Sequence, residues 1–428
     1  MVGHFIIATC LFVVTSILIP NAFQQSCVYD SYWYIQEDFV ICSDIAEDIT
    51  IIDKLLEYVA FKTVGFQLQL INCNLPNVTE GNFPNNVTLL NLSNCNISEI
   101  NKDPFENLTL LEELNLEHNN IFNVSGGIFA SLSALSNLIL RDNNLTYLTD
   151  DSFSDLSQLQ YLFLDNNQIE SIASELFRPL KELEYLYLDH NNITSLQQEV
   201  FKSLKNLMVL SLSHNNLQIL DESAFDGLNL LESLYLDNNN LSHLPKRLFS
   251  HLFFLTYLDL SENYLTLDTT YFEGLKRLLV LYLKNNNISS IQPLSFVNVP
   301  SLTMLVLSNN SIEHLTSGAF LGLIKLRRLY LDHNLIKSID GNSFQGLPAV
   351  EILYLEDNAL GDCLKNDTFT GLVSLEVLHL ENNNITCLFP GIFDQNPLTA
   401  VTLDQNLSTN ATISTITRKY HRINFYFN

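Results

Sequence analysis

The sequence predicts an α/β solenoid, a rod of short coils whose strands form a curved parallel β-sheet on the concave face. Three observations predict it: an apolar frame recurs about every 24 residues, an asparagine occupies the same place in most of these frames, and a phenylalanine recurs with the same period. Self-similarity at a fixed period of roughly 20–50 residues is typical of stacked repeats. Short helical, 3-10 or extended segments are expected on the convex face.

The frame is clearest between Leu183 and Ile193, where LEYLYLDHNNI reads L-x-x-L-x-L-x-x-N-x-L with Leu183 as position 1. Because side chains alternate along a strand, positions 4 and 6 face the interior and positions 3, 5 and 7 face the concave surface. Position 1 occurs in fifteen coils: Gly65, Val87, Leu111, Leu135, Leu159, Leu183, Leu207, Leu231, Leu255, Leu278, Leu302, Leu326, Val350, Leu375 and Leu398.

Two further rows belong to the predicted interior. The position-9 asparagines are expected to turn inward and bond backbone groups that the bend leaves unpaired. They are Asn119, Asn143, Asn167, Asn191, Asn215, Asn239, Asn263, Asn286, Asn310, Asn334, Asn358 and Asn383. The phenylalanines are expected to stack as a spine behind them. They are Phe105, Phe129, Phe153, Phe177, Phe201, Phe225, Phe249, Phe272, Phe296, Phe320, Phe344, Phe369 and Phe393.

The chain divides into a signal peptide (1–22), an N-terminal cap (23–64), the repeats (65–408) and a C-terminal tail (409–428). The apolar run from Phe5 to Ile19 is short for a membrane span and fits a secretory signal, with an uncleaved anchor as the alternative. The tail has no hydrophobic segment. We therefore expect a secreted, extracellular protein.

The last coil, which starts at Leu398, departs from the frame, and we expect it to fray. Asn406 takes its ladder position, and a basic cluster follows at Arg418, Lys419 and Arg422. Such a cluster is either solvated surface or a binding patch, and solvated surface is the more usual case.

Six cysteines remain after Cys10 of the leader, an even number that suits an oxidising compartment. We expect Cys27 and Cys42 to close a hairpin in the cap. Cys363 and Cys387 each precede a spine phenylalanine by six residues, so they should lie on stacked coils about 4.8 Å apart, within disulfide reach.

Cys73 and Cys95 both occupy position 9, where later coils have asparagine. As interior neighbours on successive coils they can form a disulfide. The alternative, which we favour, is a pair of buried thiols in place of the amide.

The concave face is rich in aromatic residues and forms the candidate binding surface, because tyrosine buries much area with few rotors. The alternative is that tyrosine simply suits exposed strands. The candidate residues are Tyr161, Phe163, Tyr185, Tyr187, Tyr235, Tyr257, Tyr282, Tyr330 and Tyr354, and acids follow the adjoining edge at Asp165, Asp189, Asp237, Asp332, Glu356 and Asp357.

The formal net charge of −26 opposes binding to nucleic acid and to anionic membranes, so a neutral or basic protein partner is expected. No catalytic motif is present, and we expect no enzyme activity, cofactor or metal. His118, His190, His214 and His333 share position 8. A metal or pH-sensing site at His190 and His214 is weighed against ordinary solvated histidines.

Glycosylation sequons recur at position 10 and, if used, cover one flank of the rod. These are Asn96, Asn144, Asn192, Asn240, Asn287 and Asn384. Asn91 and Asn309 would place glycans on or beside the concave sheet. The alternative is that asparagine-rich repeats generate sequons by accident.

From Val87 to Phe393 the pattern resembles the 24-residue extracellular leucine-rich repeats of Toll-type receptor ectodomains, chaoptin-like adhesion proteins and mosquito leucine-rich-repeat immune proteins. The chain lacks the membrane span and signalling domain of the first and the coiled coil of the long mosquito proteins, so it is most similar to a coil-less secreted member. The resemblance implies recognition of a protein partner, with a role in innate immunity; adhesion, matrix assembly or the ligand-binding part of a membrane receptor complex are the alternatives. It does not indicate the oligomeric state.

Overall fold

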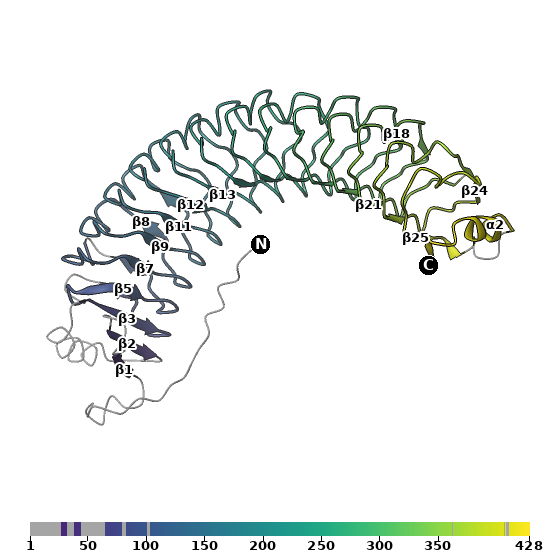
Figure 1. The fold of residues 1–428 in the computed structure, drawn as a ribbon. Coiled ribbons are helices and arrows are strands. Elements are labelled where there is room, and N and C mark those ends of the chain that lie inside the picture. Colours follow the sequence, from purple (N-terminus) through teal and green to yellow (C-terminus); the bar gives the residue numbers. More distant parts are fainter. Residues whose placement is uncertain are drawn as a thin grey trace.

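The computed structural model describes residues 27–31, 38–43, 65–78, 83–100, 103–361, 363–405, 407 and 411–428. The expected signal peptide, most of the N-terminal cap and Asn406 lie outside these residues. Figure 1 shows the described residues as a curved rod of stacked coils with strands along the inside of the arc. The predicted solenoid of about fifteen coils is confirmed.

One sheet of 18 strands lines the concave face of the described part of the chain. β1 pairs with β2 in antiparallel fashion, and every later neighbour is parallel, as the register of β11 on β12 illustrates with Leu162 opposite Leu186. Its strands are β1 (Cys27–Ser31), β2 (Asp38–Ser43), β3 (Phe66–Ile71), β5 (Val87–Asn91), β7 (Glu113–Asn115), β9 (Asn137–Ile139), β11 (Tyr161–Phe163), β12 (Tyr185–Tyr187), β13 (Val209–Ser211), β14 (Ser233–Tyr235), β15 (Tyr257–Asp259), β16 (Val280–Tyr282), β17 (Met304–Val306), β19 (Arg328–Tyr330), β21 (Ile352–Tyr354), β23 (Val377–His379), β25 (Ala400–Leu403) and β26 (Asn424–Phe427).

From the coil of Gly65 to that of Leu375, the convex side of the described residues consists of turns and two-residue strands in place of the helical segments expected among its elements. The strands pair in parallel between neighbouring coils. They are β4 (Asn77–Val78), β6 (Glu99–Ile100), β8 (Asn123–Val124), β10 (Tyr147–Leu148), β18 (His314–Leu315), β20 (Ser338–Ile339), β22 (Cys363–Leu364) and β24 (Cys387–Leu388).

The asparagine ladder is confirmed, because all twelve side chains are buried. Asn191 shows the pattern: its Nδ2 donates to the carbonyls of Leu164 (3.0 Å), Leu188 (3.1 Å) and Asp189 (3.1 Å), while its Oδ1 accepts from the Ile169 amide (2.9 Å). One amide therefore bonds its own coil and the preceding coil, which explains why asparagine recurs there.

The phenylalanine spine is also confirmed. All thirteen side chains are at most 2% exposed. Rings on neighbouring coils stack, as Phe105 does on Phe129 (6.2 Å between centroids) and Phe320 on Phe344 (6.0 Å). Each ring is covered only when the next coil is present, so the coils depend on one another for stability.

The expectation that the last coil frays is wrong. β26 extends the sheet by pairing with β25, with Val401 opposite Phe425, and helix α2 (Ala411–Lys419) forms the convex side of this added coil. The Asp404 carboxylate accepts the amides of Asn383 and Ile385 (both 3.0 Å), as a ladder asparagine does in other coils. An acid can replace the asparagine here because the bonds it makes are accepting ones.

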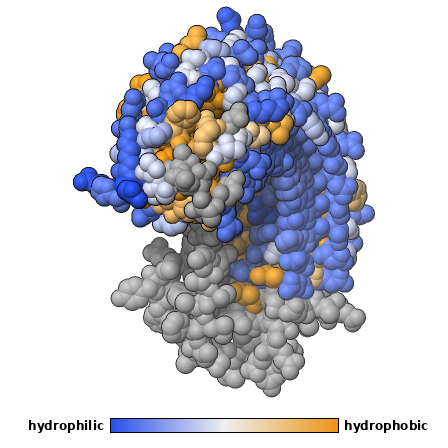
Figure 2. Space-filling model, turned by 90° about the vertical axis from the view of Figure 1, so that its right-hand side faces the viewer, coloured by the Kyte–Doolittle hydropathy of each residue, from blue (hydrophilic) through white to orange (hydrophobic). Residues whose placement is uncertain are grey.

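Arg418, Lys419 and Arg422 are exposed, in agreement with a solvated surface. Lys419 also binds Asp394 (2.6 Å) and the Pro390 carbonyl (2.9 Å) and so helps to fix α2. Phe425 and Phe427 pack on the core but stay half-buried, because no described coil covers them. Figure 2, which looks onto this end, shows hydrophobic residues gathered there, whereas the flank of stacked coils carries rows of hydrophilic residues.

Candidate functional site

The concave aromatic residues form stacks because the strands pair without a register shift. Tyr161 stacks on Tyr185 (4.9 Å between centroids) and Phe163 on Tyr187 (5.1 Å). These four residues are half-buried, and we call them the N-terminal stack. Their spacing matches the distance between neighbouring strands.

Two further groups follow along the arc. Tyr235, Tyr257 and Tyr282 form a middle cluster with tilted rings, because Tyr257 comes from position 3 and the other two from position 5. Tyr330 and Tyr354 form a C-terminal stack (4.3 Å). The sequence-predicted surface therefore consists of three aromatic groups rather than one continuous strip.

His379 extends the C-terminal stack, with its ring 4.8 Å from that of Tyr354. Sequence analysis did not include it among the binding residues, although it shares position 5 with Tyr330 and Tyr354. The three rings form one continuous stack across β19, β21 and β23. Tyrosine phenols along the sheet are partly desolvated, and burial raises the pKa of Tyr187, Tyr235, Tyr257 and Tyr282.

Acidic side chains lie beside the aromatic groups and are partly shielded from water. Burial raises the pKa of Asp165, Asp189 and Asp259. Burial, followed by the charges of Asp332, Glu381 and Asp357, raises the pKa of Glu356 to about 7. Its Oε2 atom is buried without a hydrogen-bond partner among the described residues. This part of the concave face therefore favours a cation or a proton donor from outside.

Arg141 shows how the face holds a cation. Its guanidinium lies over the Phe163 ring (5.2 Å to the centroid) and pairs with Asp165 (Nη2 to Oδ2, 3.1 Å). In other coils a serine takes the place of arginine: Ser213 bonds Asp237, and Ser308 bonds Asp332 (2.6 Å). Sequence analysis missed these partners, because the pairing becomes visible only once position 7 of one coil is placed beside position 7 of the next.

The position-8 histidines have a backbone reason for their position. His118, His190, His214 and His333 all have φ between 51° and 54°, the left-handed region that asparagine, aspartate and histidine adopt more readily than other non-glycine residues. His190 and His214 stack at 4.1 Å. Their recurrence thus reflects the turn after each strand and gives no separate support to a metal or pH-sensing site.

Glu117, His118 and Asp142 bring three possible metal-ligand atoms within 4.8 Å of one another, a group that sequence analysis did not single out. His118 contacts Glu117 at 3.5 Å and Asp142 at 3.6 Å, and half of its side chain is exposed. Exposed groups of this kind are ordinary on a strand edge, and solvent competes for each ligand atom. We assign no metal to it.

Cys73 and Cys95 are buried, and the disulfide considered for them is not formed. The Cys95 thiol donates to the Leu70 carbonyl (2.9 Å), the bond that ladder asparagines make to the preceding coil, and the Cys73 thiol contacts the Ile71 carbonyl (3.5 Å). A hydrogen bond with Cys73, together with burial, raises the pKa of Cys95. Both thiols are therefore structural substitutes for the amide.

Cys363 and Cys387 form a disulfide between β22 and β24, with their Cα atoms 4.4 Å apart. Cys27 and Cys42 are direct backbone partners in the antiparallel register of β1 and β2. That register suits the pairing expected for the cap, which stays a prediction.

The position-10 asparagines lie on the flank that follows the strands, and all six are exposed or half-exposed. Asn96 accepts a hydrogen bond from Asn120 (2.7 Å), so this flank carries a row of stacked amides. Asn309 is exposed and has a left-handed backbone, whereas Asn91 uses its Oδ1 to accept the Ser93 amide (2.9 Å). Whether these sequons are used stays a prediction.

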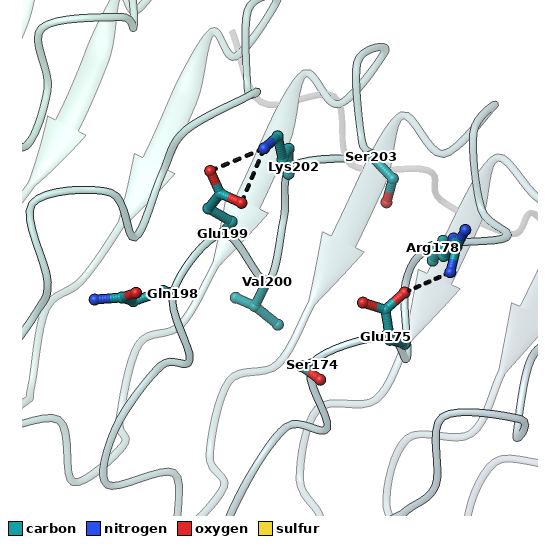
Figure 3. A pocket seen from close by; sticks show the side chains of 8 residues that line it. All are labelled: Ser174, Glu175, Arg178, Gln198, Glu199, Val200, Lys202 and Ser203. Atoms are coloured by element: carbon teal, nitrogen blue, oxygen red, sulfur yellow. Dashed lines mark hydrogen bonds and ion pairs between the residues drawn. The ribbon is translucent and has the colours of Figure 1, made fainter.

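A shallow pocket of about 450 Å³ lies on the convex side of two coils, away from the concave rows (Figure 3). Glu175 pairs with Arg178 (3.0 Å) and Glu199 with Lys202 (2.9 Å), each within its own coil. Because these charges are paired locally, the pocket offers a ligand little beyond surface polarity. Among the described residues, no helix is long and apolar enough to cross a membrane.

Comparisons with known proteins agree with this geometry. A leucine-rich-repeat protein of Leptospira interrogans is 27% identical, with a TM-score of 0.69 over 85% of this chain and 90% of that one. The LRIM1/APL1C complex (21%, 0.62) covers 93% of this chain and 67% of its own, and TLR13 in complex with ssRNA13 (20%, 0.51) covers 94% and 78%. The latter two show the fold alone.

A comparison with curated protein sequences gave no match. Models of the family described as Leucine rich repeat match residues 85–145, 133–193, 181–241, 265–312, 300–360 and 374–396, together more than half of the chain. The chain therefore belongs to the leucine-rich repeat family.

Proposed function

We propose that this protein is a secreted scaffold that binds a neutral or basic protein partner through its concave face. The observation that carries the proposal is the set of half-buried aromatic stacks with acids beside them, held on strands β11 to β21, which pair without a register shift. Rigid aromatic groups contribute binding energy at low entropic cost, and carboxylates in a partly dry setting favour a cationic contact.

The resemblance to extracellular repeat proteins supports a role in innate immunity or adhesion, in extracellular fluid. LRIM1 and APL1C form a complex with each other, which supports a protein partner by analogy. TLR13 is bound to RNA, but a net charge of −26 opposes the same ligand here. The leucine-rich-repeat fold and the concave aromatic surface support a binding scaffold rather than an enzyme.

Affinity capture tests the proposal. The full chain is immobilised, extracellular fluid is passed over it, and the retained proteins are identified. Tyr187→Ala combined with Tyr235→Ala should abolish retention while thermal stability is kept. The matched control is Tyr147→Ala combined with Tyr264→Ala, since both tyrosines are 55% exposed and lie off the concave strands. Retention that survives the concave variant, or that the control variant also loses, contradicts the proposal.

A further inference from the structure

An exposed apolar patch lies on the flank that precedes the strands, opposite to the flank with the position-10 sequons. Leu230 is 41% exposed, Phe253 55%, Phe254 42% and Leu279 42%. They come from three consecutive coils. Leu230 and Phe254 are at position 0, the residue before position 1, while Phe253 lies just before Phe254 and Leu279 is at position 2 of the next coil. The Arg277 guanidinium lies over the outward Phe254 ring, 4.8 Å from its centroid.

This flank is continuous, because the backbone ladder of the sheet extends to position 2. The Glu232 amide donates to the Met208 carbonyl (2.8 Å), Thr256 to Glu232 (2.9 Å) and Leu279 to Thr256 (2.8 Å). Side chains at the same position on successive coils therefore form straight rows along the flank. The patch is at the centre of one such set of rows.

The charges around the patch are self-complementary. Three coils before the coil of Leu255, position 0 is Glu182 and position 2 is Glu184; three coils after it, the same positions hold Lys325 and Arg327. One coil before, position 2 is Glu232, and one coil after, Lys276 and Arg277 precede the strand. Glu182 and Glu184 thus have cations at the same distance and position on the other side of the patch. The position that matches Glu232 holds Leu279, next to Arg277, and Arg327 also pairs with Glu351 of its own chain (3.1 Å).

A two-fold axis along the radius of the arc, passing through the coil of Leu255, brings the outer acids and cations into register. It reverses the order of coils and keeps each position at its own radius. Glu182 then lies opposite Lys325 of the second copy, and Glu184 opposite Arg327. Phe254 meets its own equivalent. The two outer charge rows are six strand spacings apart, roughly 29 Å, which is the width of an ordinary protein interface.

Glycans would not obstruct such a contact. Between the coils that start at Leu183 and Leu326 the sequons are Asn192, Asn240, Asn287 and Asn309, and all occupy position 8 or 10, beyond the strand. The repulsion between two chains of charge −26 opposes association, but at physiological ionic strength it is screened over about 8 Å, so the local charge pairs dominate.

We propose that a second copy of this chain docks on this flank, forming a two-fold dimer centred on Phe254 and aligned by Glu182, Glu184, Lys325 and Arg327. The contact is isologous, because both copies contribute the same surface to it. It leaves both concave faces open on the same side of the dimer. The inference is independent of the partner that the concave face binds.

Sedimentation of the full chain over a concentration series tests the dimer with two charge-reversal variants. Glu182→Lys with Glu184→Arg makes all four aligning residues cationic, and Lys325→Glu with Arg327→Glu makes them all acidic. Each variant alone should dimerise at least about tenfold more weakly than the wild type, because like charges then face each other. An equimolar mixture of the two should regain wild-type affinity as a heterodimer.

A wild-type chain that stays monomeric up to its solubility limit overturns the proposal, and so does a dimer that neither variant weakens or a mixture that recovers nothing. Phe254→Asp should abolish the dimer and leave the melting temperature of the monomer close to that of the wild type. The concave variant with Tyr187→Ala and Tyr235→Ala should dimerise normally, so failure of the proposed partner binding and failure of the dimer are distinguishable.

Discussion

The interior row at position 9 and the concave row at position 5 share one period and one register, but they differ in how much they vary. Position 9 is asparagine in twelve consecutive coils, and each amide bonds its own coil and the one before. Position 5 holds tyrosine, serine, aspartate, valine and histidine along the same stretch. An interior side chain must fit its neighbours, whereas a concave one need only be compatible with the strand, so information about a ligand can reside only in the second row.

The largest expected effect breaks the interior at the spine. Phe225→Ala removes a ring that is 1% exposed and stacked between Phe201 and Phe249, and it should lower the free energy of unfolding by about 3–5 kcal/mol. Tyr235→Ala on the concave face should cost less than about 1 kcal/mol. Urea unfolding of both variants measures the difference. Equal losses would show that the two rows do not divide structure from recognition.

The next effect compares two adjacent residues of one coil. Asn215→Ala leaves the carbonyls of Leu188 and Leu212 and the Ile193 amide without their buried partner, at a cost of about 2–4 kcal/mol. Asn216→Ala, at an exposed position, should change stability by less than about 0.5 kcal/mol. Thermal unfolding of the pair decides the matter, and similar melting temperatures would contradict the ladder's role.

The smallest effect concerns a concave side chain that costs stability. Since the pKa of Glu356 is raised from 4.5 to about 7, the ionised form is disfavoured in the fold. Stability is therefore fully present below pH 4.5 and falls as the pH rises through 7. Glu356→Gln, which does not titrate, should be more stable than the wild type by about 1–2 kcal/mol at pH 8, after allowance for solvent screening.

At pH 4.5 the same two proteins should have nearly equal stability, because the carboxyl is then protonated. Unfolding by urea at both pH values measures the change. A Gln variant that is no more stable than the wild type at pH 8 would show that Glu356 is not held in an unfavourable environment. If Glu356 is a binding residue, removing its charge should stabilise the free protein, because its surroundings suit a bound partner better than they suit the unbound fold.

The repeated frame was enough to predict the sheet, the ladder and the spine, because each of them consists of one residue type that recurs at a fixed period. The disulfide of Cys363 and Cys387 follows from the same arithmetic. Local signals failed at the C-terminus, where Phe425 and Phe427 replace the usual leucines and α2 replaces the turns. The added coil nevertheless keeps the period, since Phe425 lies 24 residues after Val401.

The pairing between coils could not be predicted from one repeat. Arg141 meets Asp165, and Ser213 meets Asp237, only because side chains 24 residues apart become neighbours. The same holds for the apolar flank, whose residues carry no motif and are visible only as exposed side chains on adjacent coils. Position 8 offered a usable signal, since φ is positive there in every coil from His118 to Asn382, and the residue is asparagine, aspartate or histidine in all of them except at Glu262.

Hydrogen exchange of the protein, free and with its captured partner, tests the central claim most directly. In the free protein, the amides that donate to ladder asparagines, such as those of Ile169, Ile193 and Leu217, should exchange slowly in every coil. Partner binding should slow exchange in the concave strands β11 to β21 and leave the convex turns unchanged. Protection confined to the convex turns, or fast exchange of the ladder amides, would contradict the account.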